Sequence, residues 1–155
     1  MNAQIAVIGG GASGLIAAVA AARNGARNVV VLERLSRPGK KLLATGNGRG
    51  NFTNASIGLA NYHGKDPSFT LFPLSVFSGT DAVSFFSALG IHPRTEADGK
   101  IFPYSGQASA LLDALRSELA RHSVPVETEF DVSAVTRTDS GFHLSAADGR
   151  TITAD

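Results

Sequence analysis

Three glycines and one acid stand at a spacing that suits phosphate and ribose chemistry. Gly9, Gly11 and Gly14 form a Gly-x-Gly-x-x-Gly motif. The first glycine allows a sharp turn, the second lets the backbone approach a pyrophosphate, and the third lets a helix pack closely on a sheet. Glu33 follows after about twenty residues, where a carboxylate can accept hydrogen bonds from both hydroxyls of an adenosine ribose. Because that carboxylate disfavours a 2′-phosphate, the motif predicts FAD or NAD rather than NADP.

The elements that must position these residues are a strand, a helix and a second strand. An apolar run at 5–8 leads into the glycines, an Ala-rich segment at 15–23 follows, and a second apolar run at 28–32 ends on Glu33. The amide groups of the first helical turn, near 12–15, lack intrahelical acceptors, and the helix dipole favours phosphate there. Since all these elements agree, we interpret the glycines as part of a dinucleotide-binding unit and not as a simple turn.

Length and composition exclude several classes of protein. The chain has 155 residues, one domain's length, with 43% hydrophobic and 17% charged residues, which suffices for a packed core. A net charge of +1 predicts neither a nucleic-acid nor a membrane partner. The sequence has no Cys, and its four His are scattered, so we expect no disulfide and no metal site. Without a membrane-length apolar segment or a signal-peptide pattern, a cytoplasmic location is expected.

The remaining chain predicts helices and a β-meander. Residues 45–54 are rich in Gly and Asn and include Arg49, which is typical of a loop around a phosphate or a polar ring edge. Two helical patterns follow, one from Ser68 and one capped by Thr80 or Asp81, and their Phe residues are expected in the core. Residues 105–122 form an amphipathic helix with solvated Glu118 and Arg121, and strands are expected at 124–130, 132–138, 142–146 and 150–154.

Three passages of the chain carry a family resemblance. The first runs from Ile5 through the glycines to Glu33, the second is the loop at 39–54, and the third is 99–105 with the helix after it. On these passages the chain resembles the bacterial BaiN/YhiN-like NAD(P)/FAD-dependent oxidoreductases. The resemblance implies an α/β Rossmann-like FAD/NAD(P)-binding domain of the glutathione-reductase type with a β-meander. It also implies FAD as the cofactor, NAD(P)H as a candidate electron donor and a small-molecule substrate.

The resemblance also assigns cofactor-binding residues. It implies that the glycine turn binds the pyrophosphate, that Glu33 binds the ribose and that the backbone of Val132 contacts the adenine. An ordinary buried valine explains the position of Val132 equally well. The loop residues would line the stretch from pyrophosphate to flavin. The expected cofactor-binding residues are Gly9, Gly11, Ala12, Ser13, Gly14, Glu33, Lys41, Leu42, Gly46, Asn47, Gly48, Arg49, Asn51 and Val132.

The chain departs from the family in two respects. Gly50 stands where the family usually has Cys, so any role of that thiol is lost. Family members are also much longer. We therefore expect residues 1–155 to form the N-terminal part of an FAD-binding domain, incomplete at its C-terminus, without the inserted substrate domain and the C-terminal FAD segment.

Three hypotheses about function stay open. The first is the FAD-binding portion of an oxidoreductase that passes hydride between a nicotinamide and an organic substrate. The second is an NAD-binding half of a dehydrogenase, although such a domain has no need of the loop at 39–54. The third is a non-catalytic remnant, which Gly50 favours. The sequence identifies no catalytic acid or base, since Tyr104 and His92 are each more often structural, and it leaves the oligomeric state unknown.

Overall fold

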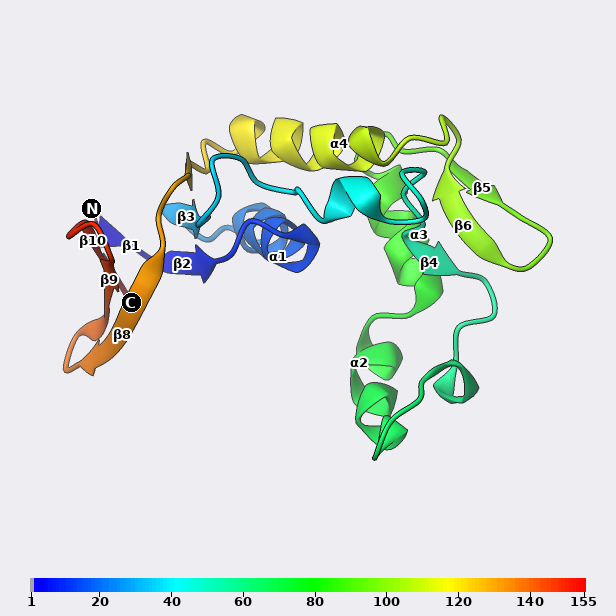
Figure 1. Cartoon of the computed structure of the whole chain (residues 1–155), viewed down its shortest axis with the longest axis horizontal. Coiled ribbons are helices and arrows are strands. Elements are labelled where there is room, and N and C mark those ends of the chain that lie inside the picture. Colours follow the sequence, from blue (N-terminus) through cyan, green and yellow to red (C-terminus); the bar gives the residue numbers. More distant parts are fainter. Residues whose placement is uncertain (1) are drawn as a thin grey trace. The chain divides into compact units, whose positions relative to one another are not determined.

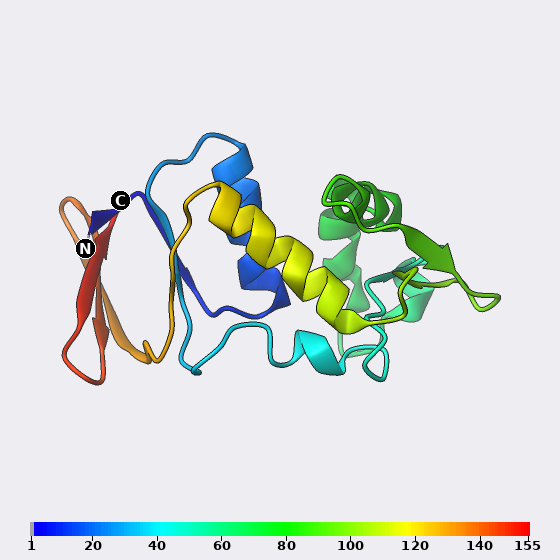
Figure 2. The ribbon, with the colours of Figure 1, turned by 90° about the horizontal axis from the view of Figure 1, so that it is seen from above.

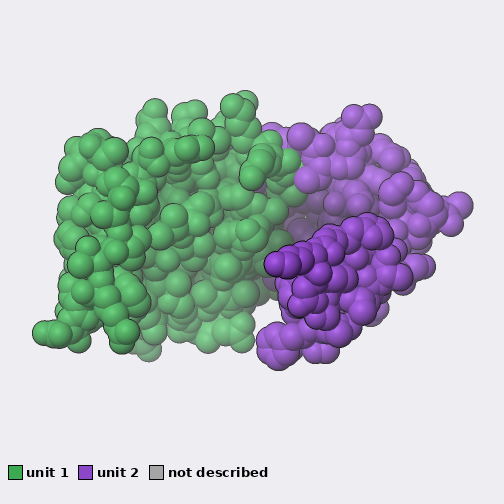
Figure 3. All heavy atoms as spheres, turned by 60° about the horizontal axis from the view of Figure 1, so that its bottom comes forward, with its two compact units in different colours: residues 1–42, 115–155 green, residues 43–114 purple. Residues whose placement is uncertain are grey.

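The computed structural model describes residues 2–155. The chain forms two compact units, one made of residues 1–42 and 115–155 and the other of residues 43–114 (Figure 3). The first unit is assembled from both ends of the chain, so its core depends on contacts between residues far apart in sequence.

The first unit contains the predicted strand–turn–helix–strand arrangement. Strand β2 (Ile5–Ile8) lies parallel to β3 (Val29–Leu32), and β3 lies parallel to the short β7 (Val126–Glu127), in the order β2-β3-β7. Helix α1 (Ala12–Arg23) connects β2 to β3 (Figure 1). All of β3 is buried, as expected for the central strand of a parallel sheet. The strand expected over 124–130 is thus limited to β7, because Glu129 takes a left-handed φ of 55° that ends the pairing.

A second sheet in the same unit is the predicted β-meander. Strands β8 (Val132–Thr138), β9 (Gly141–Ala146) and β10 (Thr151–Ala154) pair in antiparallel fashion (Figure 2). The sequence did not predict β1 (Asn2–Ala3), which pairs parallel with β10 and so brings the two ends of the chain together. A hydrophobic core joins the sheets, and its buried members are Ala3, Val30, Leu32, Phe130, Leu144, Ala146, Ile152 and Ala154.

The second unit is built on a small antiparallel sheet and short helices. Its strands are β4 (Thr53–Asn54), β5 (Pro93–Thr95) and β6 (Lys100–Pro103), in the order β4-β6-β5. Helices α2 (Leu71–Val76) and α3 (Gly79–Ser87) lie between β4 and β5 in the chain. Short 3-10 helices at Leu59–Asn61 and Pro67–Thr70 precede them, and another, at Leu42–Ala44, lies where the two units meet in the sequence. The predicted cap of α3 was two or three residues too late, since Ser78 caps the helix in a reciprocal pair with Asp81.

The prediction that the Phe residues pack in the core was wrong for one part of the second unit. Phe86 is buried, but Phe69, Phe72 and Phe77 are 73%, 77% and 49% exposed. Apolar spacing can show that a face is hydrophobic without showing what it packs against. Pro73 interrupts the regular spacing, and this segment consists of short helices on which Phe69 and Phe72 are largely exposed and Phe77 is half-exposed.

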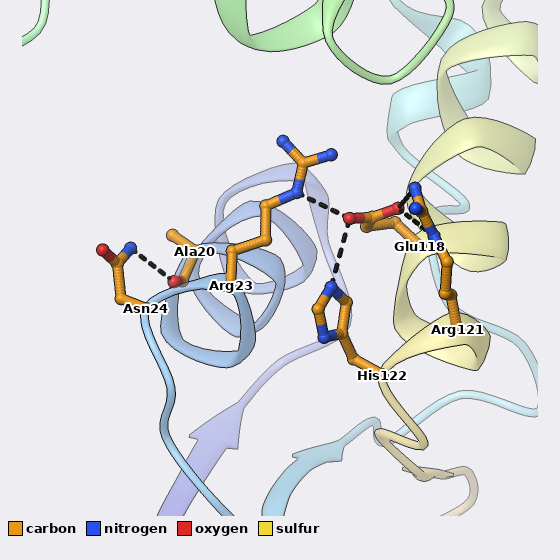
Figure 4. A network of polar contacts seen from close by, with 6 residues as sticks. All are labelled: Ala20, Arg23, Asn24, Glu118, Arg121 and His122. Atoms are coloured by element: carbon orange, nitrogen blue, oxygen red, sulfur yellow. Dashed lines mark hydrogen bonds and ion pairs between the residues drawn. The ribbon is translucent and has the colours of Figure 1, made fainter.

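Helix α4 (Ala108–Arg121) has the predicted apolar stripe, but its acid is not solvated as expected. Glu118 is only 4% exposed. Its carboxylate accepts hydrogen bonds from Arg23 Nε at 2.6 Å and Arg121 Nη2 at 2.6 Å, and lies 3.3 Å from His122 Nε2 (Figure 4). Arg23 comes from the end of α1, and sequence spacing along α4 cannot reveal a partner on another helix.

The hydrogen bond from Arg23, with further help from Arg121, lowers the pKa of Glu118 below its usual 4.5. A carboxyl with a lowered folded-state pKa stabilises the protein above its unfolded-state pKa, and this contribution is lost as pH falls through the folded value. We expect Glu118→Gln to reduce the free energy of unfolding at neutral pH by about 1–2 kcal/mol. The gap should close at acid pH, below the lowered folded-state pKa, where the wild-type carboxyl is protonated.

Urea unfolding at the two pH values measures this gap. Asp113→Asn, an exposed acid on the same helix, removes the same charge and should leave the unfolding free energy nearly unchanged. An equal loss for Glu118→Gln at both pH values would show that its ionisation has no part in the effect.

Within residues 2–155, no single helix has both the length and the apolar composition to cross a membrane. The helical segments Pro67–Val76 and Gly79–Ser87 reach that length and composition only when they are counted together, and the pair is bent by 44°.

Candidate functional site

A cleft of about 530 Å³ opens in the first unit at the carboxyl ends of β2 and β3. Ile8 pairs with Leu32 across the parallel strands, so the residues that follow them, Gly9 and Glu33, emerge side by side. The Gly9 amide donates to the Leu32 carbonyl at 2.7 Å, which holds the turn against the neighbouring strand. Among the residues expected at a cofactor, the cleft is lined by Gly9, Gly11, Ser13, Glu33, Lys41 and Val132.

The glycine turn has the geometry that its sequence predicted. Gly9 takes a φ of +99°, which side chains disfavour. A Cβ built on Gly14 would lie 1.9 Å from the Gly9 carbonyl oxygen, so only glycine lets α1 start this close to β2. A Cβ on Gly11 would meet nothing within 4 Å, which leaves open space on that side of the turn. The turn is therefore closed where the helix packs and open where a ligand would approach.

The start of α1 leaves its amides available. Gly11 is the N-cap and offers no side-chain acceptor, and the first turn has no acidic residue. The N–H groups of the first helical turn carry partial positive charge and ordinarily require an acceptor. Since Gly11 and Ser13 line the cleft, an anion in it could accept from these amides.

Glu33 is held in place by backbone groups. Its Oε2 accepts from the Gly10 amide at 2.7 Å, and its Oε1 accepts from the Leu35 amide at 2.8 Å. The Glu33 backbone is fixed as well, since its amide donates to the Glu127 carbonyl and its carbonyl accepts from the Phe130 amide. Each carboxylate oxygen can accept more than one hydrogen bond. The carboxylate is therefore oriented in advance and can still accept from hydroxyl donors.

Gly10 is a site residue that motif reasoning missed, because it occupies a variable position of the motif. A Cβ there would lie 2.8 Å from Pro38 Cβ and 3.0 Å from Glu33 Oε2. Its carbonyl also accepts from the Gly39 amide at 2.7 Å, which folds the loop after β3 back over the turn. The run of three consecutive glycines at 9–11 was the available signal.

Four cations border the same cleft. Arg34, Arg37, Lys40 and Lys41 all line it, all are exposed, and none forms an ion pair with another residue within 2–155. Unpaired cations around a concave surface raise the local concentration of anions. Glu33 and Asp131 also line the cleft, but the cations outnumber these carboxylates, so the cleft attracts negative charge despite the small net charge of the chain.

The other predicted residues of the first unit lie around the cleft in different ways. Val132 is half-buried at the start of β8 and lines the cleft with Phe130 and Ile8, which forms an apolar wall suited to a base. Ala12, Gly14 and Leu42 do not line it. Gly14 packs against Gly9, and Leu42 is buried.

In the second unit, the predicted loop residues surround a separate pocket of about 460 Å³. Gly46, Asn47, Arg49 and Asn51 line it, together with Thr45, Lys100 and Phe102. Gly48 does not line the pocket, and its carbonyl accepts from the Ala108 amide at 2.9 Å. The pocket walls carry hydroxyl, amide and cationic groups, which suit acceptor oxygens of a ligand.

Gly50 is required by the geometry of this loop. Its φ is +78°, and a Cβ would lie 2.9 Å from both Ala108 Cα and Leu111 Cδ1. We expect Gly50→Cys to lower the free energy of unfolding by about 2–3 kcal/mol, through crowding added to the left-handed backbone. Urea unfolding measures the loss.

Gly48→Ala is the matched control for Gly50→Cys, because Gly48 has a similar φ of +82° and its Cβ would come no nearer than 4.0 Å to Leu43 O. Equal losses for the two variants would remove crowding as the cause.

The groups that line the cleft of the first unit fit a dinucleotide. Helix-start amides and unpaired cations suit a diphosphate, an oriented carboxylate suits a ribose, and an apolar wall suits a base. Within residues 2–155 there is no group of three or more His, Asp or Glu side chains that could hold a metal ion.

Comparison of the sequence with known proteins agrees with this geometry. The sequence profile of the HI0933-like protein Rossmann domain matches residues 3–155. A 3-dehydro-bile acid delta(4,6)-reductase of Clostridium scindens is 42% identical over 153 residues, which are 98% of this chain and 37% of that protein. A ribosomal RNA dihydrouridine synthase of Escherichia coli is 29% identical over 138 residues, 89% of this chain and 34% of that protein. The chain thus spans about a third of the length of these relatives.

Solved structures share the fold. A 3-ketosteroid-delta4-(5alpha)-dehydrogenase from Rhodococcus jostii RHA1 matches with a TM-score of 0.71 and 17% identity, over 99% of this chain and 44% of that one. A flavocytochrome c3 fumarate reductase in its open conformation matches with a TM-score of 0.67 and 18% identity, over 99% and 32%. The predicted Rossmann-like fold of FAD-binding proteins is confirmed, and the match covers only part of those chains.

Proposed function

The chain belongs to the HI0933-like Rossmann-domain family, and from this premise we propose that it is the FAD-binding portion of a flavin-dependent oxidoreductase. The observation that carries the proposal is the position of Glu33, whose carboxylate is fixed by the Gly10 and Leu35 amides in the same cleft as the uncapped start of α1. One cleft thereby offers groups for ribose and for pyrophosphate together.

The proposal assigns roles to the residues described above. Gly9, Gly11, Ala12, Ser13 and Gly14 would hold the pyrophosphate, Glu33 the ribose and Val132 the adenine, with Lys41 and Leu42 beside the phosphates. In the second unit, Gly46, Asn47, Gly48, Arg49 and Asn51 would meet the part of the cofactor nearer the flavin. We propose that residues 1–155 are the N-terminal part of the FAD-binding domain.

The flavin, when bound, supplies hydride chemistry, and the protein supplies binding, orientation and electrostatics. We infer that the whole flavoprotein passes hydride from a reduced nicotinamide to an organic substrate. One relative is named as a delta(4,6)-reductase of a 3-dehydro-bile acid, and the other is named for the formation of dihydrouridine in ribosomal RNA. An unsaturated ring conjugated to a carbonyl is therefore our proposed substrate class, and the higher identity to the bile acid enzyme favours a small molecule.

The proposal is tested by titrating the purified chain with FAD and following quenching of flavin fluorescence. We expect saturable binding that ADP displaces and that weakens as salt is raised, because unpaired cations border the cleft. Displacement of FAD by NAD at lower concentration than by ADP would instead indicate the NAD-binding half of a dehydrogenase. Absence of saturable FAD binding by the chain would refute the proposal.

Activity is measured separately, with NADH and electron acceptors in the presence of FAD. Turnover by the chain would exclude a non-catalytic remnant. FAD binding without turnover is the result expected of a cofactor-binding portion that spans about a third of its relatives.

A further inference from the structure

The second unit holds one arginine in a defined position beside its pocket. The Arg49 guanidinium carbon lies 4.2 Å from the centroid of the Phe102 ring, and Arg49 Nη1 donates to Glu96 Oε1 at 2.8 Å. Phe102 is only 1% exposed, so the ring beneath the guanidinium is fixed by the core. The planar cation is therefore restrained on one face by an aromatic ring and at one edge by a carboxylate.

The backbone that carries Arg49 is also restrained. The Gly48 and Gly50 amides both donate to the Thr45 carbonyl, at 3.0 and 2.9 Å. Asn51 Nδ2 donates to the carbonyls of Thr53 and Ile101, which ties the loop to β6. With the backbone fixed, the side-chain torsions of Arg49 are the freedom that remains, and these are what Glu96 and Phe102 limit.

We propose that Glu96 is a positioning residue, which holds Arg49 ready to donate to an acceptor oxygen of the bound FAD; this rests on the proposed function. The guanidinium has five N–H donors, and Glu96 engages one nitrogen. Arg49 lines the pocket with Asn47 and Asn51, and its side chain keeps 45% of its surface exposed. Donors therefore remain for a ligand, and the entropy of ordering a long side chain is already lost before binding.

A purely electrostatic role for Glu96 predicts the opposite sign. Glu96 also lies 3.6 Å from Arg94 Nη2, so its charge offsets two cations near the pocket. If only charge mattered, removing Glu96 would strengthen binding of an anionic cofactor. If positioning matters, removing it weakens binding, because Arg49 must then be ordered at the moment of binding.

Two substitutions separate these roles. Glu96→Gln removes the charge but keeps an oxygen that can accept from Arg49, whereas Glu96→Ala removes both. We expect Glu96→Ala to weaken FAD binding by about three- to tenfold at constant ionic strength, and Glu96→Gln to stay within about twofold. Asp113→Ala, an exposed acid of the same unit without a partner among the described residues, should have no effect. In an Arg49→Ala background, Glu96→Ala should have no further effect.

A second readout needs no cofactor. The Nε–H resonance of Arg49, assigned by its absence in Arg49→Lys, should be sharp in the wild type and broadened in Glu96→Ala. Equal or tighter FAD binding by Glu96→Ala, or an Arg49 resonance that is broad in the wild type, would overturn the proposal. If the wild type fails to bind FAD, the proposed function fails, and the resonance still decides whether Glu96 positions Arg49.

Discussion

Gly14→Ala is expected to lower the free energy of unfolding by about 3 kcal/mol and to abolish FAD binding. The added methyl group would lie 1.9 Å from the Gly9 carbonyl oxygen, a contact that neither backbone can relieve without separating α1 from β2. Because the same movement displaces the start of the helix, the phosphate-facing amides would be lost together with the packing. Urea unfolding and flavin fluorescence measure the two effects.

Gly11→Ala is the matched control for Gly14→Ala. Its Cβ meets no atom within 4 Å, and its φ of −76° is open to alanine. We expect the unfolding free energy to change by less than about 0.5 kcal/mol, while FAD binding weakens because the methyl group occupies the space of the ligand. A Gly11→Ala protein that unfolds as easily as Gly14→Ala, or a Gly14→Ala protein of wild-type stability, would contradict this account of the turn.

Glu33→Ala should be the most damaging change of a charged residue. It removes the acceptor of the buried Gly10 amide and of the Leu35 amide, at a cost of about 2–3 kcal/mol in unfolding free energy. It also removes the proposed partner of the ribose, so FAD affinity should fall by about tenfold or more. Chemical unfolding measures the first effect, and fluorescence titration measures the second.

Glu127→Ala controls for Glu33→Ala. This acid ends the neighbouring strand β7, is half-exposed and does not line the cleft. It should change neither FAD affinity nor stability appreciably. If both variants weaken FAD binding equally, general loss of charge at the sheet edge, and not the fixed carboxylate, is responsible.

The glycine turn was predictable because its requirements are local and strict. A sharp turn and a close helix approach each restrict the residue type at one position, and Gly9 and Gly14 have the geometry expected of them, whereas the ligand-facing role of Gly11 stays a prediction. Gly10 was not predicted, because its need for glycine comes from Pro38 and Glu33, which lie more than twenty residues further along the chain. Its role appears only when β3 and the following loop are in place.

Residues whose surroundings are formed by distant segments escaped prediction. Glu118 is buried because Arg23 of α1 meets it, and Arg49 is paired with an acid 47 residues away. Conversely, Phe69 and Phe72 have the spacing of core residues and are exposed, since hydrophobic spacing does not specify a partner surface. Amphipathic patterns identified helices α3 and α4, while charge pairs and exposed apolar faces depended on tertiary structure.

The most direct test of the central claim is a ¹⁵N–¹H NMR titration of the chain with ADP and then with FAD. We expect the amide resonances of residues 9–15 and of Leu35 to shift first and to reach saturation with both ligands. Shifts confined to other parts of the chain, or none in 9–15 at saturating FAD, would contradict a dinucleotide site built on the glycine turn and Glu33.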